Sequence, residues 1–110
     1  MGDRMSGPVL PGSIVAAHLE ACAAELAGTA EVGTAGELAD VLEHLAAGQR
    51  QLSLALARLA GVVRGSQVDG ALTEVLEAAA SAAGYSADAI AESEPVLGAL
   101  LQTADEDTRL

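Results

Sequence analysis

The sequence predicts an all-α protein: a four-helix up-down bundle per chain, with a long central second helix that dimerises into a larger helical bundle. Composition, punctuation and periodicity lead to this prediction. Hydrophobic residues make up 51% of the 110-residue chain, yet they are mainly Ala, Leu and Val, with no Phe, no Trp and one Tyr. Apolar residues recur every three or four positions in segments separated by turn residues, and the longest segment keeps a heptad repeat throughout.

The small size of the apolar side chains favours association. Alanine has the strongest helix propensity but buries little area per residue. A small core built from such side chains gains stability when more surface is buried against a second copy. We therefore expect the chain to pair with itself.

The turn residues divide the chain into three parts. Residues 1–12, which contain two prolines and three glycines, predict a flexible N-terminal tail. Residues 13–102 predict the helical bundle domain, and residues 103–110 predict an acidic, frayed C-terminal tail. The opening residues lack the apolar core of a signal peptide, so we expect the cytoplasm as the compartment.

The first two helices have recognisable ends. The first is predicted over 13–27, with Gly28 as its stop and an apolar face of Val15, Leu19, Cys22 and Leu26. Cys22 on that face is expected to be a small buried hydrophobe. The second helix is predicted to start at a capping box formed by Thr34 and Glu37 and to end at Arg64.

The third and fourth helices are predicted to meet at a corner. A second capping box at Ser66 opens the third helix, which is predicted to end at Gly84. Ser86 is predicted to cap the fourth helix, which continues to about Gln102. Pro95 then kinks this helix or begins a fresh short helix after a break near Ser93.

The second helix carries the candidate oligomer interface. Its apolar residues alternate in steps of four and three, which defines the a and d positions of a heptad. The stripe consists of Leu38, Leu42, Leu45, Gln49, Leu52, Leu56, Leu59 and Val63. The flanking e and g positions are small or apolar instead of charged, which predicts a helix covered by several neighbours and not a free zipper.

Gln49 is the polar member of this stripe and lies near the middle of the long helix. A buried polar residue at an a position costs stability but selects one register and stoichiometry. In an antiparallel pair centred here, the two copies of Gln49 can bond each other. The other explanation, in which its amide bonds a group within the same chain, stays open.

Charge and motifs restrict the function classes. The formal net charge is −11, from 16 acidic and 5 basic residues, which disfavours nucleic acid and an anionic membrane as partners. His18 and Cys22 lie one helical turn apart, but with only His44 as a further imidazole we expect no metal site. No catalytic motif is present, so we expect no enzyme and no cofactor. The prediction is a protein-binding module for adaptor, docking or assembly roles, with itself and an unidentified protein as partners.

Two alternatives remain. The spacing of Ala80, Gly84 and Ile90 matches the small–glycine–apolar pattern of a helix-turn-helix corner, as in transcriptional or plasmid-type regulators. The segment after Gly84 nevertheless carries acids and no Arg or Lys before Arg109. The second alternative is a carrier that holds a small aliphatic ligand in the bundle core, which an enclosed cavity between helices would favour.

Overall fold

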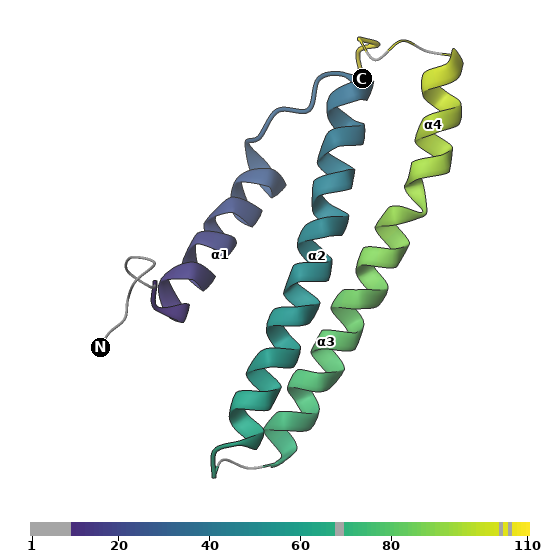
Figure 1. The fold of residues 1–110 in the computed structure, drawn as a ribbon. Coiled ribbons are helices and arrows are strands. Elements are labelled where there is room, and N and C mark those ends of the chain that lie inside the picture. Colours follow the sequence, from purple (N-terminus) through teal and green to yellow (C-terminus); the bar gives the residue numbers. More distant parts are fainter. Residues whose placement is uncertain (1–9, 68–69, 104, 106) are drawn as a thin grey trace, which may run out of the picture. The chain divides into compact units, whose positions relative to one another are not determined.

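The computed structural model describes residues 10–67, 70–103, 105 and 107–110 and divides the chain into two compact units. The first unit, Met1–Val32, contains helix α1 (Gly12–Gly28). The second unit, Gly33–Leu110, contains α2 (Ala35–Arg64), α3 (Gly70–Ala91) and α4 (Ser93–Thr103) (Figure 1). The described residues are mostly helical, and β structure among them is limited to one isolated bridge, so the all-α class is confirmed.

Helix α1 starts and ends within one residue of the predicted limits. Pro11 precedes it, and the backbone N–H groups of Thr29 and Ala30 both donate to the carbonyl of Glu25 at its end, each at 2.8 Å. Every residue of this helix is exposed, including the apolar ones. Cys22 is exposed instead of buried as predicted, because the first unit contains no other described helix against which its side chain could be buried.

The start of α2 confirms the predicted cap. The Oγ1 of Thr34 accepts a hydrogen bond from the backbone N–H of Glu37 at 3.2 Å. The Glu37 carboxylate reaches back one residue further than in the usual capping box, because it accepts from the backbone N–H of Gly33 at 3.0 Å. Two otherwise unpaired donors at the helix start are thereby satisfied.

The predicted end of the third helix at Gly84 is wrong. Helix α3 continues through Gly84 and Ser86 as far as Ala91. A glycine inside a helix costs about 1 kcal/mol, which packing against a neighbouring helix outweighs. A Cβ built on Gly84 would lie 3.5 Å from the Oγ of Ser53 on α2, so this position contacts the neighbouring helix.

The break between α3 and α4 falls at Glu92. Pro95 lies in the first turn of α4, where its missing N–H costs little. The Oγ of Ser93 donates to the carbonyl of Ile90 at 2.6 Å across the break. This is the second of the two outcomes expected for Pro95, a fresh short helix after a break near Ser93.

The capping box predicted at Ser66 falls partly outside the described residues, because it requires Asp69. At the preceding helix end, the Oγ of Ser66 donates to the carbonyl of Val63 at 2.6 Å. Helix α3 is described from Gly70 onward.

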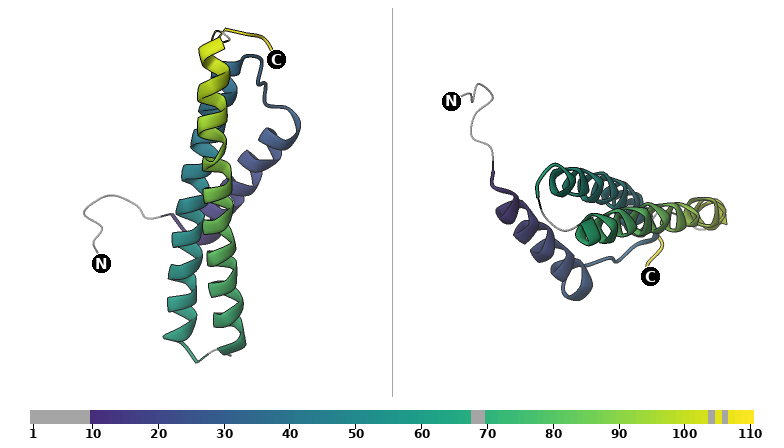
Figure 2. Two further views of the ribbon diagram at one scale, coloured as in Figure 1. Left: turned by 90° about the vertical axis from the view of Figure 1, so that its right-hand side faces the viewer. Right: turned by 90° about the horizontal axis from the view of Figure 1, so that it is seen from below.

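Helices α2 and α3 form an antiparallel hairpin held by small side chains (Figures 1 and 2). On α2 the buried residues include Ala46 and Ala60, and on α3 they include Thr73, Ala80 and Ala87. The Oγ of Ser53 donates to the carbonyl of Ala80 at 2.7 Å across this seam. Side chains of this size allow two helix backbones to approach closely.

The last residues of the chain are not frayed as predicted. The backbone N–H of Ala35 donates to the carbonyl of Thr108 at 2.8 Å, and the N–H of Leu110 donates to the carbonyl of Gly33 at 3.0 Å. Thr34 and Arg109 form the isolated antiparallel bridge. The physical reason is that the first N–H groups of α2 lack acceptors within the helix, and the N–H of Ala35 donates to the extended C-terminal segment instead.

The finer prediction of a four-helix up-down bundle is not confirmed. The second unit is a hairpin whose one arm is α2 and whose other arm is α3 followed by α4, and α1 belongs to a separate unit. Among the described residues, no helix has the length and hydropathy needed to cross a membrane.

Candidate functional site: the leucine face of the hairpin

The seam between α2 and α3 fixes which side chains remain outside it. The seam positions of α2 repeat every seven residues as Ala39, Ala46, Ser53 and Ala60, and those of α3 as Thr73, Ala80 and Ala87. In an α-helix, a residue three positions after a given residue lies on one side of it, and a residue four positions after lies on the other. Because α2 and α3 run antiparallel, residues at the same offset from the seam lie on the same side of the hairpin in both helices.

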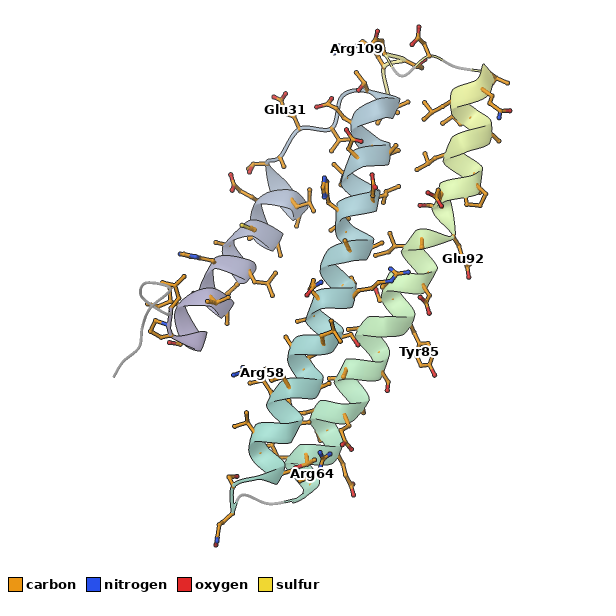
Figure 3. The ribbon with its side chains drawn as sticks, viewed as in Figure 1. Glu31, Arg58, Arg64, Tyr85, Glu92 and Arg109 are labelled. Atoms are coloured by element: carbon orange, nitrogen blue, oxygen red, sulfur yellow. The ribbon has the colours of Figure 1, made fainter. Side chains whose placement is uncertain are left out.

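Residues that lie four positions after a seam residue form a charged edge of the hairpin. Arg64 and Arg50 follow seam residues of α2 by four positions, and each pairs with an acid of α3. Arg64 bonds Glu77, and Arg50 lies 3.4 Å from Asp88. Figure 3 shows the Arg64 side chain beside α3, while Tyr85 projects away from α2. Both ion pairs are exposed, so this edge faces solvent.

Residues three positions after a seam residue, or one position before it, lie on the other side and form an apolar face, which we call the leucine face. From α2 it contains the whole predicted stripe: Leu38, Leu42, Leu45, Gln49, Leu52, Leu56, Leu59 and Val63. From α3 it contains Leu72, Leu76, Ala79, Ala83, Ser86 and Ile90. None of these positions is charged. A surface with this composition resembles the charge-depleted centre of a protein interface.

The leucine face is incompletely covered. Leu59 is 45% exposed and Leu72 is 43% exposed, whereas the other α2 members of the face are half-buried. The buried apolar side chains of the described residues are all alanines. The small residues of the hairpin are thus buried in the seam, and its large aliphatic residues lie on one side of the seam.

Two polar side chains lie in the middle of this face. The Ser53–Ala80 bond and the Arg50–Asp88 pair set the register of the arms, which places Gln49 at about the level of Ser86. Both residues are half-buried. In the described part of the chain, neither the Gln49 amide nor the Ser86 hydroxyl has a hydrogen-bond partner.

The three residues of the predicted helix-turn-helix corner do not form a corner. Ala80, Gly84 and Ile90 all belong to the uninterrupted helix α3. Their spacing instead reflects the hairpin: Ala80 is in the seam, Gly84 contacts Ser53, and Ile90 lies on the leucine face. The turn on which the regulator alternative depended is absent.

Sequence reasoning missed the α3 half of the leucine face. The predicted stop at Gly84 divided this helix between two elements and hid its periodicity. The available signal was the heptad spacing of Leu76, Ala83 and Ile90, which matches that of the α2 stripe.

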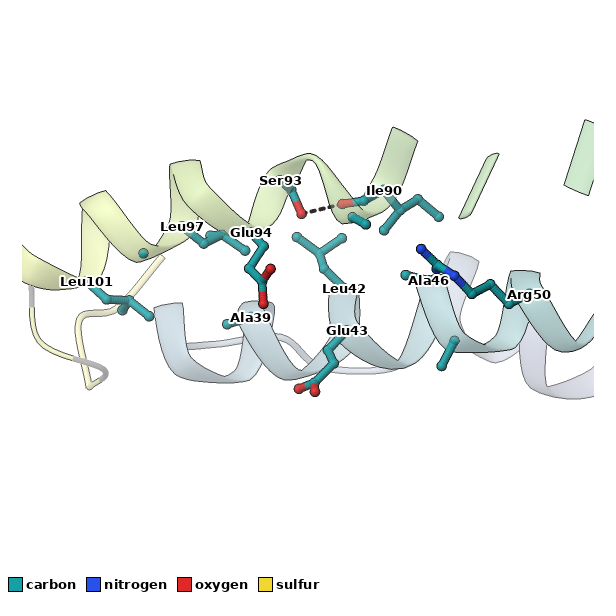
Figure 4. A pocket seen from close by; sticks show the side chains of 13 residues that line it. Ala39, Leu42, Glu43, Ala46, Arg50, Ile90, Ser93, Glu94, Leu97 and Leu101 are labelled. Atoms are coloured by element: carbon teal, nitrogen blue, oxygen red, sulfur yellow. Dashed lines mark hydrogen bonds between the residues drawn. The ribbon is translucent and has the colours of Figure 1, made fainter. Parts of the chain in front are cut away.

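A second feature is a hollow between α2 and α4, which we call the α2–α4 groove (Figure 4). It has a volume of about 440 Å³ and is partly open to solvent. Its apolar lining includes Leu42, Ile90, Leu97 and Leu101. It is therefore not the enclosed core cavity that the carrier alternative anticipated.

The described residues contain no group of three or more His, Cys, Asp or Glu side chains arranged to hold a metal ion. Comparison with protein-family models, with curated proteins and with solved structures finds no match for this chain.

Proposed function

We propose that this protein is a non-catalytic self-association module in which two hairpins pair through their leucine faces. The assembled form, acidic on its outside, then serves as an adaptor or docking platform for a further protein. The observation that carries the proposal is the uncharged, half-exposed leucine face that the small-residue seam leaves beside it.

The size of the face is appropriate for a dimer. A helix of 30 residues is about 45 Å long, and two helices side by side are about 20 Å wide. Such a face offers on the order of 900 Å² to a partner, which is close to the roughly 800 Å² per partner of a standard interface. Burying two hairpins against each other produces four helices around one apolar core, a stable and common arrangement.

Charge favours a second copy over an arbitrary apolar partner in one respect. A chain with a net charge of −11 repels its copies unless the contact surface is free of acids. The leucine face has no charged position, and both described ion pairs lie on the opposite edge. The acids can therefore stay in water when two leucine faces meet.

The polar layer gives the pairing an orientation. Gln49 lies at the midpoint of α2 and is level with Ser86, so a two-fold axis through this layer brings two amides and two hydroxyls together. If the axis is perpendicular to the helices, it makes the hairpins antiparallel, and each amide finds the partner that it lacks within one chain. A pairing shifted along the helices would bury these groups against leucine, which costs about 1–3 kcal/mol per unpaired group.

The main test is sedimentation velocity of the full chain over a range of concentrations, comparing Leu59→Glu with the matched control Leu54→Glu. Leu59 is on the leucine face, whereas Leu54 is 64% exposed and lies outside it. We expect the parent chain and Leu54→Glu to dimerise, and Leu59→Glu to dissociate with Kd raised about a hundred-fold or more. Circular dichroism verifies that both variants keep their helix content.

A parent chain that stays monomeric at every concentration would overturn the proposal, as would equal behaviour of the two leucine variants. Salt provides a further criterion. Since the contact is apolar and the net charge is repulsive, raising the ionic strength should leave the dimer intact or tighten it.

The polar layer is tested by Gln49→Leu against Gln51→Leu, an exposed position on the same helix. We expect Gln49→Leu to retain association but to give mixed stoichiometries by native mass spectrometry, whereas Gln51→Leu remains a uniform dimer. If Gln49→Leu is equally uniform, the register role is refuted while self-association stands.

A further inference from the structure

The α2–α4 groove arises because the second arm changes direction. At the break at Glu92, α4 turns away from α2, which the views of Figures 1 and 2 both show. The row of small residues on α2 nevertheless continues along this stretch at Ala39, beyond Ala46 in the last turn of the closed seam. Where α3 is the neighbour, such residues permit close packing, but opposite the diverging α4 they leave space unfilled.

The space is apolar on its inside. Leu42 projects from α2 toward α4, and Ile90, Leu97 and Leu101 come from the other arm (Figure 4). Gly98 widens the groove on the α4 side, and a Cβ built on it would meet nothing within 4 Å. A volume of about 440 Å³ is within the range of small-molecule sites. An apolar hollow of this size favours an aliphatic occupant, because water gains few hydrogen bonds there.

Some polar side chains at the groove already have a hydrogen-bond or ion-pair partner, and others do not. The Oγ of Ser93 donates to the carbonyl of Ile90, and Arg50 lies 3.4 Å from Asp88. Glu43 and Glu94 are exposed, and neither has a hydrogen-bond or ion-pair partner among the described residues. The Glu94 side chain extends from α4 toward α2 (Figure 4). The unengaged charge at the mouth is therefore negative.

We infer that the α2–α4 groove binds an aliphatic ammonium compound. Its alkyl chain lies among Leu42, Ile90 and Leu97, and its cationic head stays at the mouth beside the carboxylate of Glu94. The Glu43 carboxylate points away from α4 (Figure 4). The groove is formed within one hairpin, so this inference does not require self-association, although Leu42 and Ile90 belong to both the groove and the leucine face.

Isothermal titration calorimetry with the full chain tests the inference, using three single-chain probes below their micelle-forming concentrations. The probes are decyltrimethylammonium, decanol and decanoate, which share an alkyl chain and differ in head charge. We expect the cation to bind about threefold more tightly than decanol, because an exposed carboxylate favours it modestly. Decanoate should bind more weakly than decanol.

Two variants locate the binding. Gly98→Leu places a side chain in the groove, whereas Gly61→Leu makes the same change at a helical position with equal open space outside the groove. We expect Gly98→Leu to weaken binding of the cation at least tenfold and Gly61→Leu to leave it unchanged. Glu94→Gln should remove the preference for the cation over decanol without affecting decanol itself, whereas Glu43→Gln should leave this preference in place.

The inference is overturned if the cation does not bind, if decanoate binds as well as the cation, or if the two leucine variants behave alike. Sedimentation velocity of the same samples separates this result from the self-association proposal. A chain that dimerises but binds no probe refutes the groove alone, and a monomer that binds the cation refutes the dimer alone.

Discussion

The two ends of the hairpin differ in how closely the second arm packs against the row of small seam residues on α2, which are Ala39, Ala46, Ser53 and Ala60. Along α3, Ser53 of α2 lies so close to Ala80 that its side-chain hydroxyl reaches the backbone of the other helix, and Ala46 and Ala60 of the same row are buried. Along α4, Ala39 of this row lines a groove of about 440 Å³. The row is regular, so the difference comes from the arm that faces it.

The comparison shows that small residues define a close helix contact only where the axis of the opposing helix stays aligned with theirs. Helix α3 is uninterrupted over 22 residues, although it contains a glycine. The break at Glu92, followed by Pro95, ends this alignment, because proline has no N–H to continue the hydrogen-bond pattern. A closed seam stabilises the fold, and an open groove leaves room for a ligand.

The largest expected effect distinguishes the closed end from the open end. Ala60 is 1% exposed in the seam, whereas Ala47 is exposed and lines the groove. Ala60→Leu should lower the free energy of unfolding by about 1–3 kcal/mol, because the two backbones must separate to admit the larger side chain. Ala47→Leu should change it by less than about 0.5 kcal/mol.

Urea unfolding followed by circular dichroism, at one protein concentration for all variants, measures both changes. If Ala47→Leu is as destabilising as Ala60→Leu, the two ends are equally closed and the contrast between seam and groove is wrong.

The sequence predicted the helices but not all of their junctions. Local signals sufficed for α1 and for α2, whose cap at Thr34 and end at Arg64 depend on neighbouring residues alone. The eight-residue stripe of α2 was also predicted, and the structure leaves it half-exposed on one side of the hairpin. These features follow from short-range periodicity and capping.

The junction of α3 and α4 could not be predicted in this way. Gly84 followed by Ser86 has the local chemistry of a helix end and a new cap, and only the contact with Ser53 on another helix explains why α3 continues. The α2–α4 groove was missed for a related reason. Its lining combines residues about fifty positions apart in the chain, and it depends on where the second arm breaks.

An intermediate effect sharpens the assignment of Gly84 to a helix interior. Gly84→Ala should raise the free energy of unfolding by about 0.5–1 kcal/mol, because alanine loses less backbone entropy on helix formation. The added Cβ would lie 3.5 Å from the Oγ of Ser53, an ordinary contact distance. Thermal and urea unfolding give the change directly.

A lower free energy of unfolding for Gly84→Ala would indicate a turn with positive φ at this position and would support the predicted helix-turn-helix corner. Gly61→Ala provides the matched control, since Gly61 also lies inside a helix and a Cβ there meets nothing within 4 Å. Similar gains for both variants would establish that Gly84 behaves as a plain helical position.

The smallest expected effect concerns the charged edge at the closed end of the hairpin. Glu77→Gln removes the partner of Arg64, whereas Glu74→Gln removes an exposed acid of the same helix that makes no described ion pair. Both variants lower the net negative charge equally, so the difference between them reports on the pair. We expect Glu77→Gln to be less stable than Glu74→Gln by about 0.2–1 kcal/mol at low salt, because the pair is exposed to solvent. At molar salt the difference should disappear.

A difference that persists at molar salt would mean that the Glu77 side chain stabilises the hairpin by packing. The charged edge would then contribute to the seam instead of lying outside it.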